Sequence, residues 1–187
     1  MATYKEIKGT NIEALETDPT YPVTGQVWYN TTSNVLKGSV FAAAAWASGG
    51  SLNTGRSQMG ASGVQNAAIA SGGHEGTTLT GNNTELYNGS SWTEVNNLNT
   101  GRRILAQAGA TDAALAFGGG PPNTGATESW NGSNWTEVND LNSGRGFIGG
   151  SGTQTAALGY GGPGTTVDTA ATEEWVGDGT LSENIRS

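Results

Sequence analysis

The sequence contains no cysteine, so neither disulfide bonds nor thiolate metal sites can form. Lys and Arg together number 8 against 16 Asp and Glu, and the formal net charge is −8. A surface that binds nucleic acid needs clustered basic side chains, so we expect no nucleic-acid partner. The longest apolar run, FAAAAWA at 41–47, is too short to cross a bilayer, and the first residues lack the apolar stretch of a secretory signal. We therefore expect no membrane insertion.

Glycine and tryptophan are the residues that the sequence does have in quantity. It contains 31 Gly, 6 Trp and 5 Tyr among 187 residues, with only 13% charged residues. Disordered chains are usually richer in charge and proline and poorer in aromatics. The apolar fraction of 34% is below the usual range, so we expect a packed domain with a thin core.

A unit of about 43–46 residues recurs three times. The motif ELYNGSSWTEVNNL, from Glu85, returns as ESWNGSNWTEVNDL from Glu128. Each unit has an Arg in a T/S-G-R tripeptide, a Trp ten residues before it and a glycine pair sixteen residues after it. The members are Arg56, Arg102 and Arg145; Trp46, Trp92 and Trp135; and Gly72-Gly73, Gly118-Gly119 and Gly161-Gly162. Matching gaps on both sides of the Arg indicate an internal repeat.

Short β-strands are predicted within each unit. The runs AAIA, AALAF and AALGY each end at a glycine pair, which favours strands over helices. The segments TELYNGSSWTEV and TESWNGSNWTEV read as hairpins around Asn88-Gly89 and Asn131-Gly132, because Asn-Gly supplies the positive φ angles of tight turns. The repeat length suits four short strands, the size of one propeller blade. The predicted fold class is therefore all-β.

The order of glycine pair, aromatic residue, Trp and Arg over residues 46–180 resembles the kelch motif of β-propellers. The resemblance implies four-stranded blades in which the glycine pairs allow close strand packing. It also implies that Trp46, Trp92 and Trp135, with Tyr87, Trp130 and Trp175, form the core between blades. The kelch-like galactose oxidases hold copper with Cys, Tyr and His, and this sequence has no Cys and one His. That activity is excluded.

The sequence accounts for about three blades, and the last unit breaks off. Thr180 stands where the repeat would have a Trp, which reads as a terminal cap. Propellers close with about four to eight blades, and an open array leaves sheet edges exposed. We expect a homo-oligomer that completes the fold, either two chains giving six blades or sheets stacked around a three-fold axis.

Residues 1–38 differ from the repeat domain, 39–187, because they hold all the lysines. The stretch from Pro22 predicts a strand GQVWYN, a turn TTSN and a strand VLKG. It resembles a P-x-x-G-[DQ]-[VIL]-W-[YF]-N hairpin module near the start of bacteriophage tail fibres, with Trp28, Tyr29 and Asn30 matched. Joined to kelch-like repeats, it is similar to structural proteins of marine phages, cyanophages included. The resemblance implies an N-terminal anchor that docks on other virion proteins.

Candidate chemistry is sparse, and we predict no catalytic, cofactor-binding or metal-binding residue. Glu85 and Glu128 recur at one repeat position, so we expect each to contact an Arg or the backbone within its blade. His74 has no His or Cys partner for metal or acid–base work, so it reads as an exposed loop residue. The loop residues His74, Asn82 and Asn123 are the candidates for binding a host-surface glycan.

Three functions follow from these observations. The first is a non-enzymatic virion structural protein, a tail-fibre or head/tail appendage subunit that docks through residues 1–38 and presents a β-rich body, with a role in host attachment. The alternative is a glycan- or protein-binding β-propeller module outside any virion. An enzyme is the third, and no constellation of residues favours it.

Overall fold

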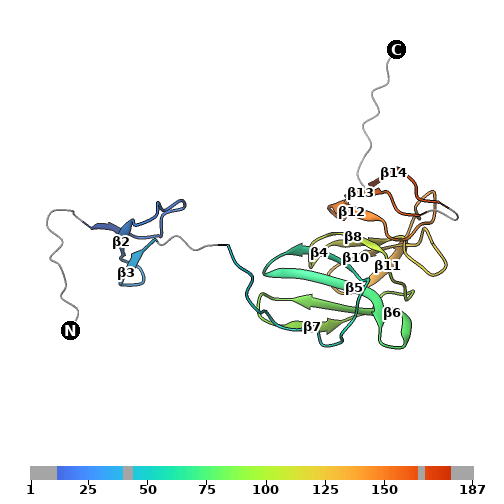
Figure 1. Cartoon of the computed structure of the whole chain (residues 1–187). Coiled ribbons are helices and arrows are strands. Elements are labelled where there is room, and N and C mark those ends of the chain that lie inside the picture. The colour runs from blue at the N-terminus through green and yellow to red at the C-terminus, as the bar shows by residue number, and fades with distance from the viewer. Residues whose placement is uncertain (1–11, 40–43, 164–166, 178–187) are drawn as a thin grey trace, which may run out of the picture. The chain divides into compact units, whose positions relative to one another are not determined.

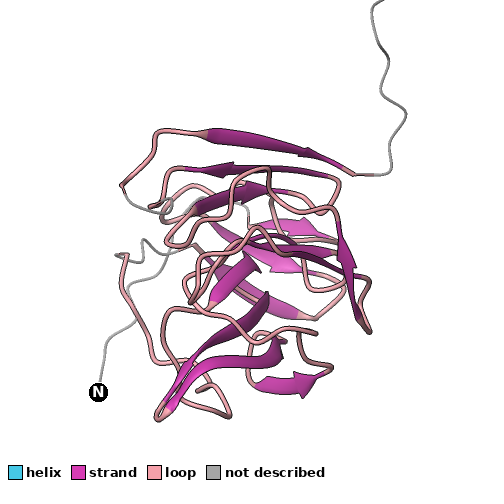
Figure 2. Ribbon diagram, turned by 90° about the vertical axis from the view of Figure 1, so that its right-hand side faces the viewer, coloured by secondary structure: helices cyan, strands magenta, loops and turns pink. Residues whose placement is uncertain are grey.

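The structure is a computed structural model that describes residues 12–39, 44–163 and 167–177. These residues form four β-sheets of three or four strands and contain no helix (Figure 2). The predicted all-β class is therefore correct. The sheets are separate, and no closed barrel or propeller forms among the described residues. Two compact units make up the chain, Met1–Ala47 and Ser48–Ser187. The change of composition after residue 38 precedes the boundary between these units.

The first unit is a three-stranded sheet in the order β1-β2-β3. The strands β2 (Val27–Asn30) and β3 (Val35–Gly38) pair as the predicted antiparallel hairpin. Gly25 before the hairpin has a φ of 84°, and Asn34 in its turn has a φ of 56°. The strand β1 (Glu13–Leu15) pairs with β2 in parallel, an arrangement that the sequence pattern did not indicate.

The second unit contains three meanders, which we call the first, middle and last sheets; they lie beside one another in chain order (Figure 1). The first sheet is β4 (Gly60–Val64), β5 (Ala67–Glu75), β6 (Thr78–Tyr87) and β7 (Trp92–Val95). The middle sheet is β8 (Ala106–Gly109), β9 (Ala114–Phe117), β10 (Thr127–Trp130) and β11 (Trp135–Val138). The last sheet is β12 (Gly149–Gly152), β13 (Ala156–Tyr160) and β14 (Thr172–Val176). Thr180, the fourth-strand position of the last sheet, lies outside the described residues.

Close approach of the first strands joins neighbouring sheets, since β8 contacts both β4 and β12. Small residues on these strands make the approach possible. A Cβ on Gly60 of β4 would lie 3.1 Å from the Leu105 side chain, and one on Gly150 of β12 would lie 2.8 Å from the Ala106 Cβ. Any larger residue at these two positions would push the sheets apart.

Both predicted Asn-Gly hairpins form, with turns that differ from the expected kind. Gly89 and Gly132 have positive φ angles of 92° and 89°, while Asn88 and Asn131 are not among the residues with positive φ. Instead, the Asn88 side-chain oxygen accepts hydrogen bonds from the Ser90 and Ser91 amides at 3.0 and 2.9 Å. The Asn therefore stabilises the turn through its side chain, and only the glycine supplies the left-handed backbone.

Candidate functional site

A buried Arg–Glu ion pair lies within each sheet of the second unit. The Arg that precedes the sheet reaches the Glu on its third strand. The pairs are Arg56–Glu85 at 2.5 Å, Arg102–Glu128 at 2.8 Å and Arg145–Glu173 at 2.7 Å. The predicted Glu–Arg contact inside each unit is confirmed for Glu85 and Glu128. Glu173, which we did not single out, is the third member, and the Thr-Glu dipeptide that it shares with the other two could have identified it.

An Asn three residues before each Arg completes the cluster. Its backbone amide and its Nδ2 both donate to the second oxygen of the Glu carboxylate. The residues are Asn53, Asn99 and Asn142. We call each set of three side chains an Asn–Arg–Glu cluster. The sequence analysis missed these Asn residues, although the recurring Leu-Asn dipeptide marks them.

The charged groups of each cluster are held by one another and by hydrogen bonds. Burial lowers the pKa of Arg102. The attraction of the Glu128 carboxylate opposes that shift, so the charged state of Arg102 depends on its partner. For Glu173, desolvation acts to raise the pKa, but hydrogen bonds from Asn142 and Arg145 outweigh it and the pKa lies below its usual value. Both oxygens of each carboxylate already accept hydrogen bonds. Each carboxylate is therefore fixed in place by its Arg and its Asn.

The glycine pairs connect each sheet to the next. All six glycines have positive φ angles, between 66° and 112°. The Gly73 amide donates to the Arg102 carbonyl at 2.9 Å, and the Gly119 amide donates to the Arg145 carbonyl at the same distance. A Cβ on Gly72 would lie 2.5 Å from that Arg102 oxygen, so the first glycine leaves room for the following unit. The first two pairs thus allow close packing between neighbouring sheets.

The Trp side chains of the middle sheet lie in the core between it and the first sheet. Trp130 and Trp135 are 0% and 5% exposed, and their ring centroids are 5.3 Å apart. The Trp135 Nε1 donates to the Thr84 Oγ1 of the first sheet at 3.1 Å. The predicted core positions are therefore confirmed for Trp130 and Trp135.

The equivalent aromatic residues of the outer sheets are less buried. Tyr87 and Trp92 stack at 5.0 Å between ring centroids and are half-buried. Trp175 is also half-buried, and its Nε1 donates to the Gln154 carbonyl at 2.9 Å.

Trp46 was predicted to lie in the core, and that prediction is wrong for the chain by itself. Its relative exposure is 104%. By the repeat register Trp46 corresponds to Trp92 and Trp135, which lie on the fourth strand of a sheet. Among the described residues, no repeat sheet precedes the first sheet of the second unit for Trp46 to join.

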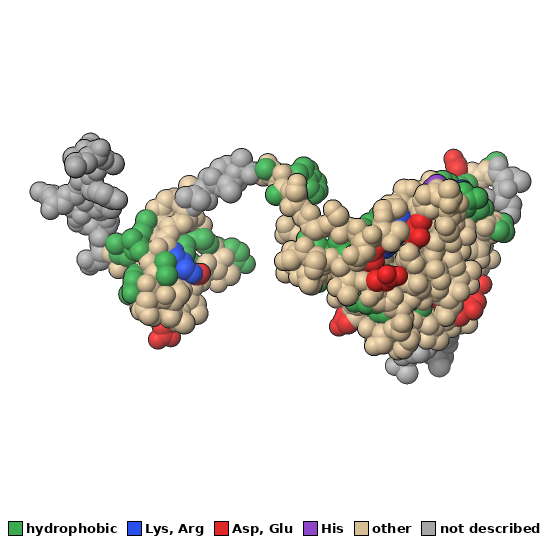
Figure 3. Space-filling view, turned by 90° about the horizontal axis from the view of Figure 1, so that it is seen from below, with side chains coloured by type: hydrophobic (Ala, Val, Ile, Leu, Met, Phe, Trp, Pro, Cys, Tyr) green, Lys and Arg blue, Asp and Glu red, His purple; other side chains and the backbone are tan. Residues whose placement is uncertain are grey.

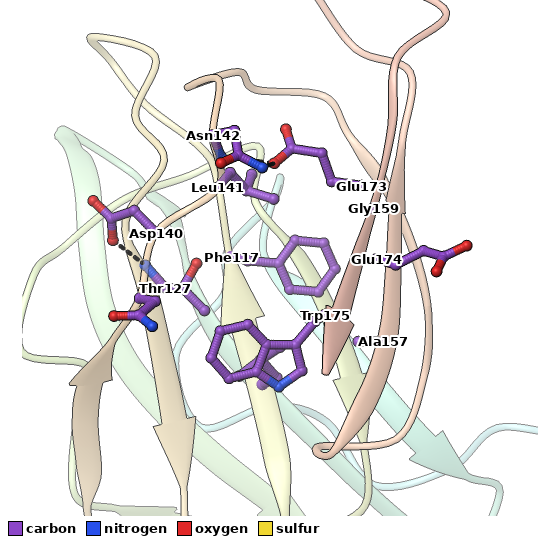
Figure 4. Close-up of a pocket in the computed structure, with 12 residues that line it drawn as sticks. Phe117, Thr127, Asp140, Leu141, Asn142, Ala157, Gly159, Glu173, Glu174 and Trp175 are labelled. Carbon is purple, nitrogen blue, oxygen red and sulfur yellow. Dashed lines mark hydrogen bonds between the residues drawn. The ribbon is translucent and has the colours of Figure 1, made fainter. Parts of the chain in front are cut away.

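A cavity of about 70 Å³ lies between the middle and last sheets, where the packing lacks one side chain (Figure 4). Phe117 of the middle sheet and Trp175 of the last sheet point toward it. Thr127, which corresponds to Thr84, lines the wall. Between the first and middle sheets, the equivalent position beside Thr84 holds Trp135. The cavity therefore lies where a fourth-strand Trp of the last sheet would lie.

In the first unit, the Asp18 carboxylate holds the hairpin together. Its Oδ1 accepts hydrogen bonds from the Trp28 Nε1 at 3.0 Å and the Asn30 Nδ2 at 2.8 Å, and its Oδ2 pairs with the Lys37 Nζ at 2.6 Å. These contacts, the Lys37 bond foremost, lower the pKa of Asp18 to about 2. Trp28 and Asn30 are buried, whereas Tyr29 points outward with 36% exposure.

The structure also places the residues that were weighed for chemistry. His74 lies on β5, and its backbone pairs with that of Ser57, so it is a strand residue and not the loop residue that we expected. The Asn82 Nδ2 donates to the Leu98 carbonyl at 3.2 Å, and the Asn123 Nδ2 donates to the Pro163 carbonyl at 3.1 Å. No cluster of His, Asp and Glu that could hold a metal occurs within the described ranges.

The visible face of the second unit is mostly uncharged polar surface with separate acidic side chains (Figure 3). In the described part of the chain, no helix is long and apolar enough to cross a membrane. No protein-family model matches the sequence, and no curated protein is significantly similar to it.

Proposed function

We propose that the chain is a non-enzymatic structural protein built from kelch-like repeats that assembles with copies of itself. The observation that carries this proposal is the repetition of one construction in three successive sheets. The Asn–Arg–Glu cluster recurs in each sheet. The glycine pair links each of the first two sheets to the sheet that follows. Side chains used in this way in every unit serve architecture, whereas a catalytic set is usually confined to one place.

Within that class, we propose a virion protein: a tail-fibre or head/tail appendage subunit of a bacteriophage. The support is the pairing of a small N-terminal unit with a polar, acidic repeat body. The hairpin around Trp28 and Asn30 is organised by its own Asp18 hub. Residues 1–38 would dock on other virion proteins, and the repeat body would face outward. Assembly would take place in the host cytoplasm, and the protein would act on the particle.

Particle composition tests this proposal. Phage particles purified from lysates of the host that carries this gene should contain the chain in fixed stoichiometry with the other structural proteins, measured by quantitative mass spectrometry. A gene that lacks residues 2–38 should give particles without the chain, while the chain itself remains in the lysate. Absence of the full chain from purified particles would exclude the virion role.

A second candidate is a glycan- or protein-binding propeller module outside a virion. The observation in its favour is that a segment of variable sequence follows each glycine pair at the same place in the repeat. Binding of the full chain to a glycan array, lost when the segment at 120–126 is exchanged for a Gly-Ser segment of equal length, would support this role. Binding to the array with no chain in particles would favour it over the virion role.

A further inference from the structure

We propose that residues 44–59 of a second copy of this chain complete the last sheet. In this arrangement residues 46–49 become its missing fourth strand, and Trp46 fills the cavity beside Trp175. The inference takes from the proposed function only the expectation of a homo-oligomer. It goes further by naming the segment and the surface that meet.

The register of the repeat assigns residues 46–49 to a fourth strand. Trp92 lies ten residues before Arg102 and starts β7, and Trp135 lies ten residues before Arg145 and starts β11. Trp46 lies ten residues before Arg56 but pairs with no strand among the described residues, and its side chain is exposed. By its register, the segment corresponds to the fourth strand of a repeat sheet that the described residues do not include.

The last sheet lacks this strand among the described residues. In the first two sheets Tyr87 pairs with Trp92, and Trp130 pairs with Trp135. In the last sheet the equivalent residue, Trp175, lies on β14, which has no strand on its outer side. Continuing the register places Trp46 of the second copy opposite Trp175. The rings would then stack as in the other two pairs.

The cavity between the middle and last sheets has the lining that the Trp46 side chain requires. Its lining includes Thr127, Leu141 and Trp175, the counterparts of Thr84, Leu98 and Trp130, which surround Trp135 between the first two sheets. In the proposed assembly the Trp46 indole enters this space, and its Nε1 donates to the Thr127 Oγ1. One chain thus has both an exposed Trp46 indole and an unfilled cavity whose lining matches the surroundings of Trp135.

The glycine pair of the last sheet provides a second, independent fit. Positions for a Cβ on Gly72 and on Gly118 are crowded by the following unit, through the Arg102 and Arg145 carbonyls at 2.5 and 2.7 Å. At Gly161 the described residues offer only the Thr169 carbonyl, at 3.9 Å. The following unit would be the first unit of a second copy. Its Leu52, Met59 and Arg56 carbonyl correspond to the groups that cover Gly72 and Gly118.

A series of backbone hydrogen bonds that links successive units also ends in the last unit. The Ile104 amide donates to the Gln58 carbonyl at 2.7 Å, and the Phe147 amide donates to the Ile104 carbonyl at 2.8 Å. All three residues have positive φ angles, between 48° and 59°. The next step of the series would join the Gln58 amide of a second copy to the Phe147 carbonyl. Phe147, now 64% exposed, would be covered as Ile104 is covered by Gly146.

Two copies that exchange these segments form a closed ring of six sheets, because each copy contributes three. Six lies within the range of four to eight blades in which propellers close, whereas the nine sheets of three copies lie outside it. The contact is head-to-tail, so closure after two copies prevents growth into a filament. The assembly is therefore a dimer.

Cysteine cross-linking tests the contact directly, since the chain has no cysteine of its own. Full-length copies carrying Trp46→Cys and copies carrying Trp175→Cys, with different tags, are co-expressed and oxidised. Directly opposed residues on paired strands lie within disulfide reach. We expect a disulfide-linked species that contains both tags. The matched control replaces Trp175→Cys with Glu174→Cys, whose side chain lies on the other face of β14, and the mixed species should be lost.

Three results would overturn the inference. The first is a mixed species no more abundant than in the Glu174→Cys control. The second is a disulfide formed within single chains when one copy carries both Trp46→Cys and Trp175→Cys, which would place the strand in the same copy. The third is a mixed species that appears only after residues 178–187 are removed, which would show that the chain's own tail occupies the edge.

Light scattering of Trp46→Ala gives a second measurement. Trp46 is fully exposed in the chain by itself, so its removal leaves the fold intact, and the solution mass should fall from that of a dimer to that of one chain. A dimer that persists in this variant would contradict the inference. Neither experiment involves particles, so failure here is separate from failure of the virion proposal.

Discussion

The middle and last sheets have similar sequences but differ in burial. In the middle sheet every residue of β9 is buried, whereas β13, from the same position of the repeat, alternates between buried and exposed residues. The TESW of β10 is almost wholly buried, and the TEEWV of β14 is not. Between these two sheets, burial therefore differs with the surroundings of a strand more than with its residues. The carboxylate of the polar cluster follows this difference, since Glu128 is 2% exposed in the middle sheet and Glu173 is 15% exposed in the last one.

The largest difference between the two sheets should come from the clusters. Replacing one partner of a buried ion pair leaves the other charge unpaired, which costs about 3–5 kcal/mol. We expect Glu128→Gln to lower the free energy of unfolding by about this amount. Glu173→Gln should lower it less, because the Glu173 side chain is 15% exposed against 2% for Glu128, so water can reach the position that the carboxylate leaves. Urea denaturation followed by tryptophan fluorescence measures both. Equal losses would show that the end sheet is as well covered as the middle one.

The next largest effect should come from the tryptophan between the first and middle sheets. Trp135→Ala removes a side chain that is 5% exposed. The expected loss is about 3–4 kcal/mol in the free energy of unfolding. Trp46→Ala, measured in dilute solution where single chains predominate, should leave it unchanged. A comparable loss in both variants would mean that Trp46 is buried in its own chain.

The glycine pairs offer a smaller and sharper comparison. Alanine at Gly118 or Gly161 must adopt a left-handed backbone, with φ of 67° at both positions, which costs about 1–2 kcal/mol. Gly118→Ala adds a clash with the Arg145 carbonyl, so its loss in unfolding free energy should exceed that of Gly161→Ala in the isolated chain. In the assembled protein, Gly161→Ala should also weaken dimerisation, measured by sedimentation at several concentrations. A Gly161→Ala dimer as tight as wild type would mean that nothing covers this glycine.

The smallest effect should come from acid in the first unit. Asp18 has a folded-state pKa of about 2 against a usual 3.8, so its contribution is complete above pH 3.8 and is lost as the pH falls through about 2. The Trp28 indole resonance in NMR spectra of the full chain should therefore shift toward its unfolded position over this range. Asp18→Asn, which cannot titrate, should not show this transition. A Trp28 signal unchanged down to pH 2 would mean that other contacts hold the hairpin.

Much of the repeat could be predicted because its local chemistry is strong. Apolar runs that end at glycine pairs became β5, β9 and β13, and the Asn-Gly segments became hairpins. The recurrence of Glu85 and Glu128 correctly indicated a structural contact with Arg. The spacing alone did not say which Arg. Glu85 pairs with Arg56, 29 residues earlier, because the first and third parts of one meander are brought together by the strands between them.

Other features had no local pattern to reveal them. The strand β1 is three residues long and pairs in parallel with β2, and periodicity cannot establish so short a contact. Asp18 became the hub of the hairpin through bonds to residues 10 to 19 positions away. Trp46 was assigned to the core because the repeat register was applied without asking whether a preceding sheet exists in the chain. A residue's place in a repeat predicts its environment only where the neighbouring unit is present.

The glycine pairs also separate two kinds of sequence within one repeat. Before each pair, residues are fixed by the Asn–Arg–Glu cluster and by contacts with the neighbouring sheet. After it comes a segment of variable sequence, which is a long continuation of the β5–β6 hairpin in the first sheet and a turn with Pro121 and Pro122 in the middle one. Its contacts with the following unit include backbone hydrogen bonds, as where the Arg102 amide donates to the Gly81 carbonyl and the Arg145 amide to the Thr124 carbonyl. Surface connections of this type tolerate insertions well. The frame can therefore carry different sequences at equivalent positions, and one scaffold can present several unrelated surfaces without a change in its core.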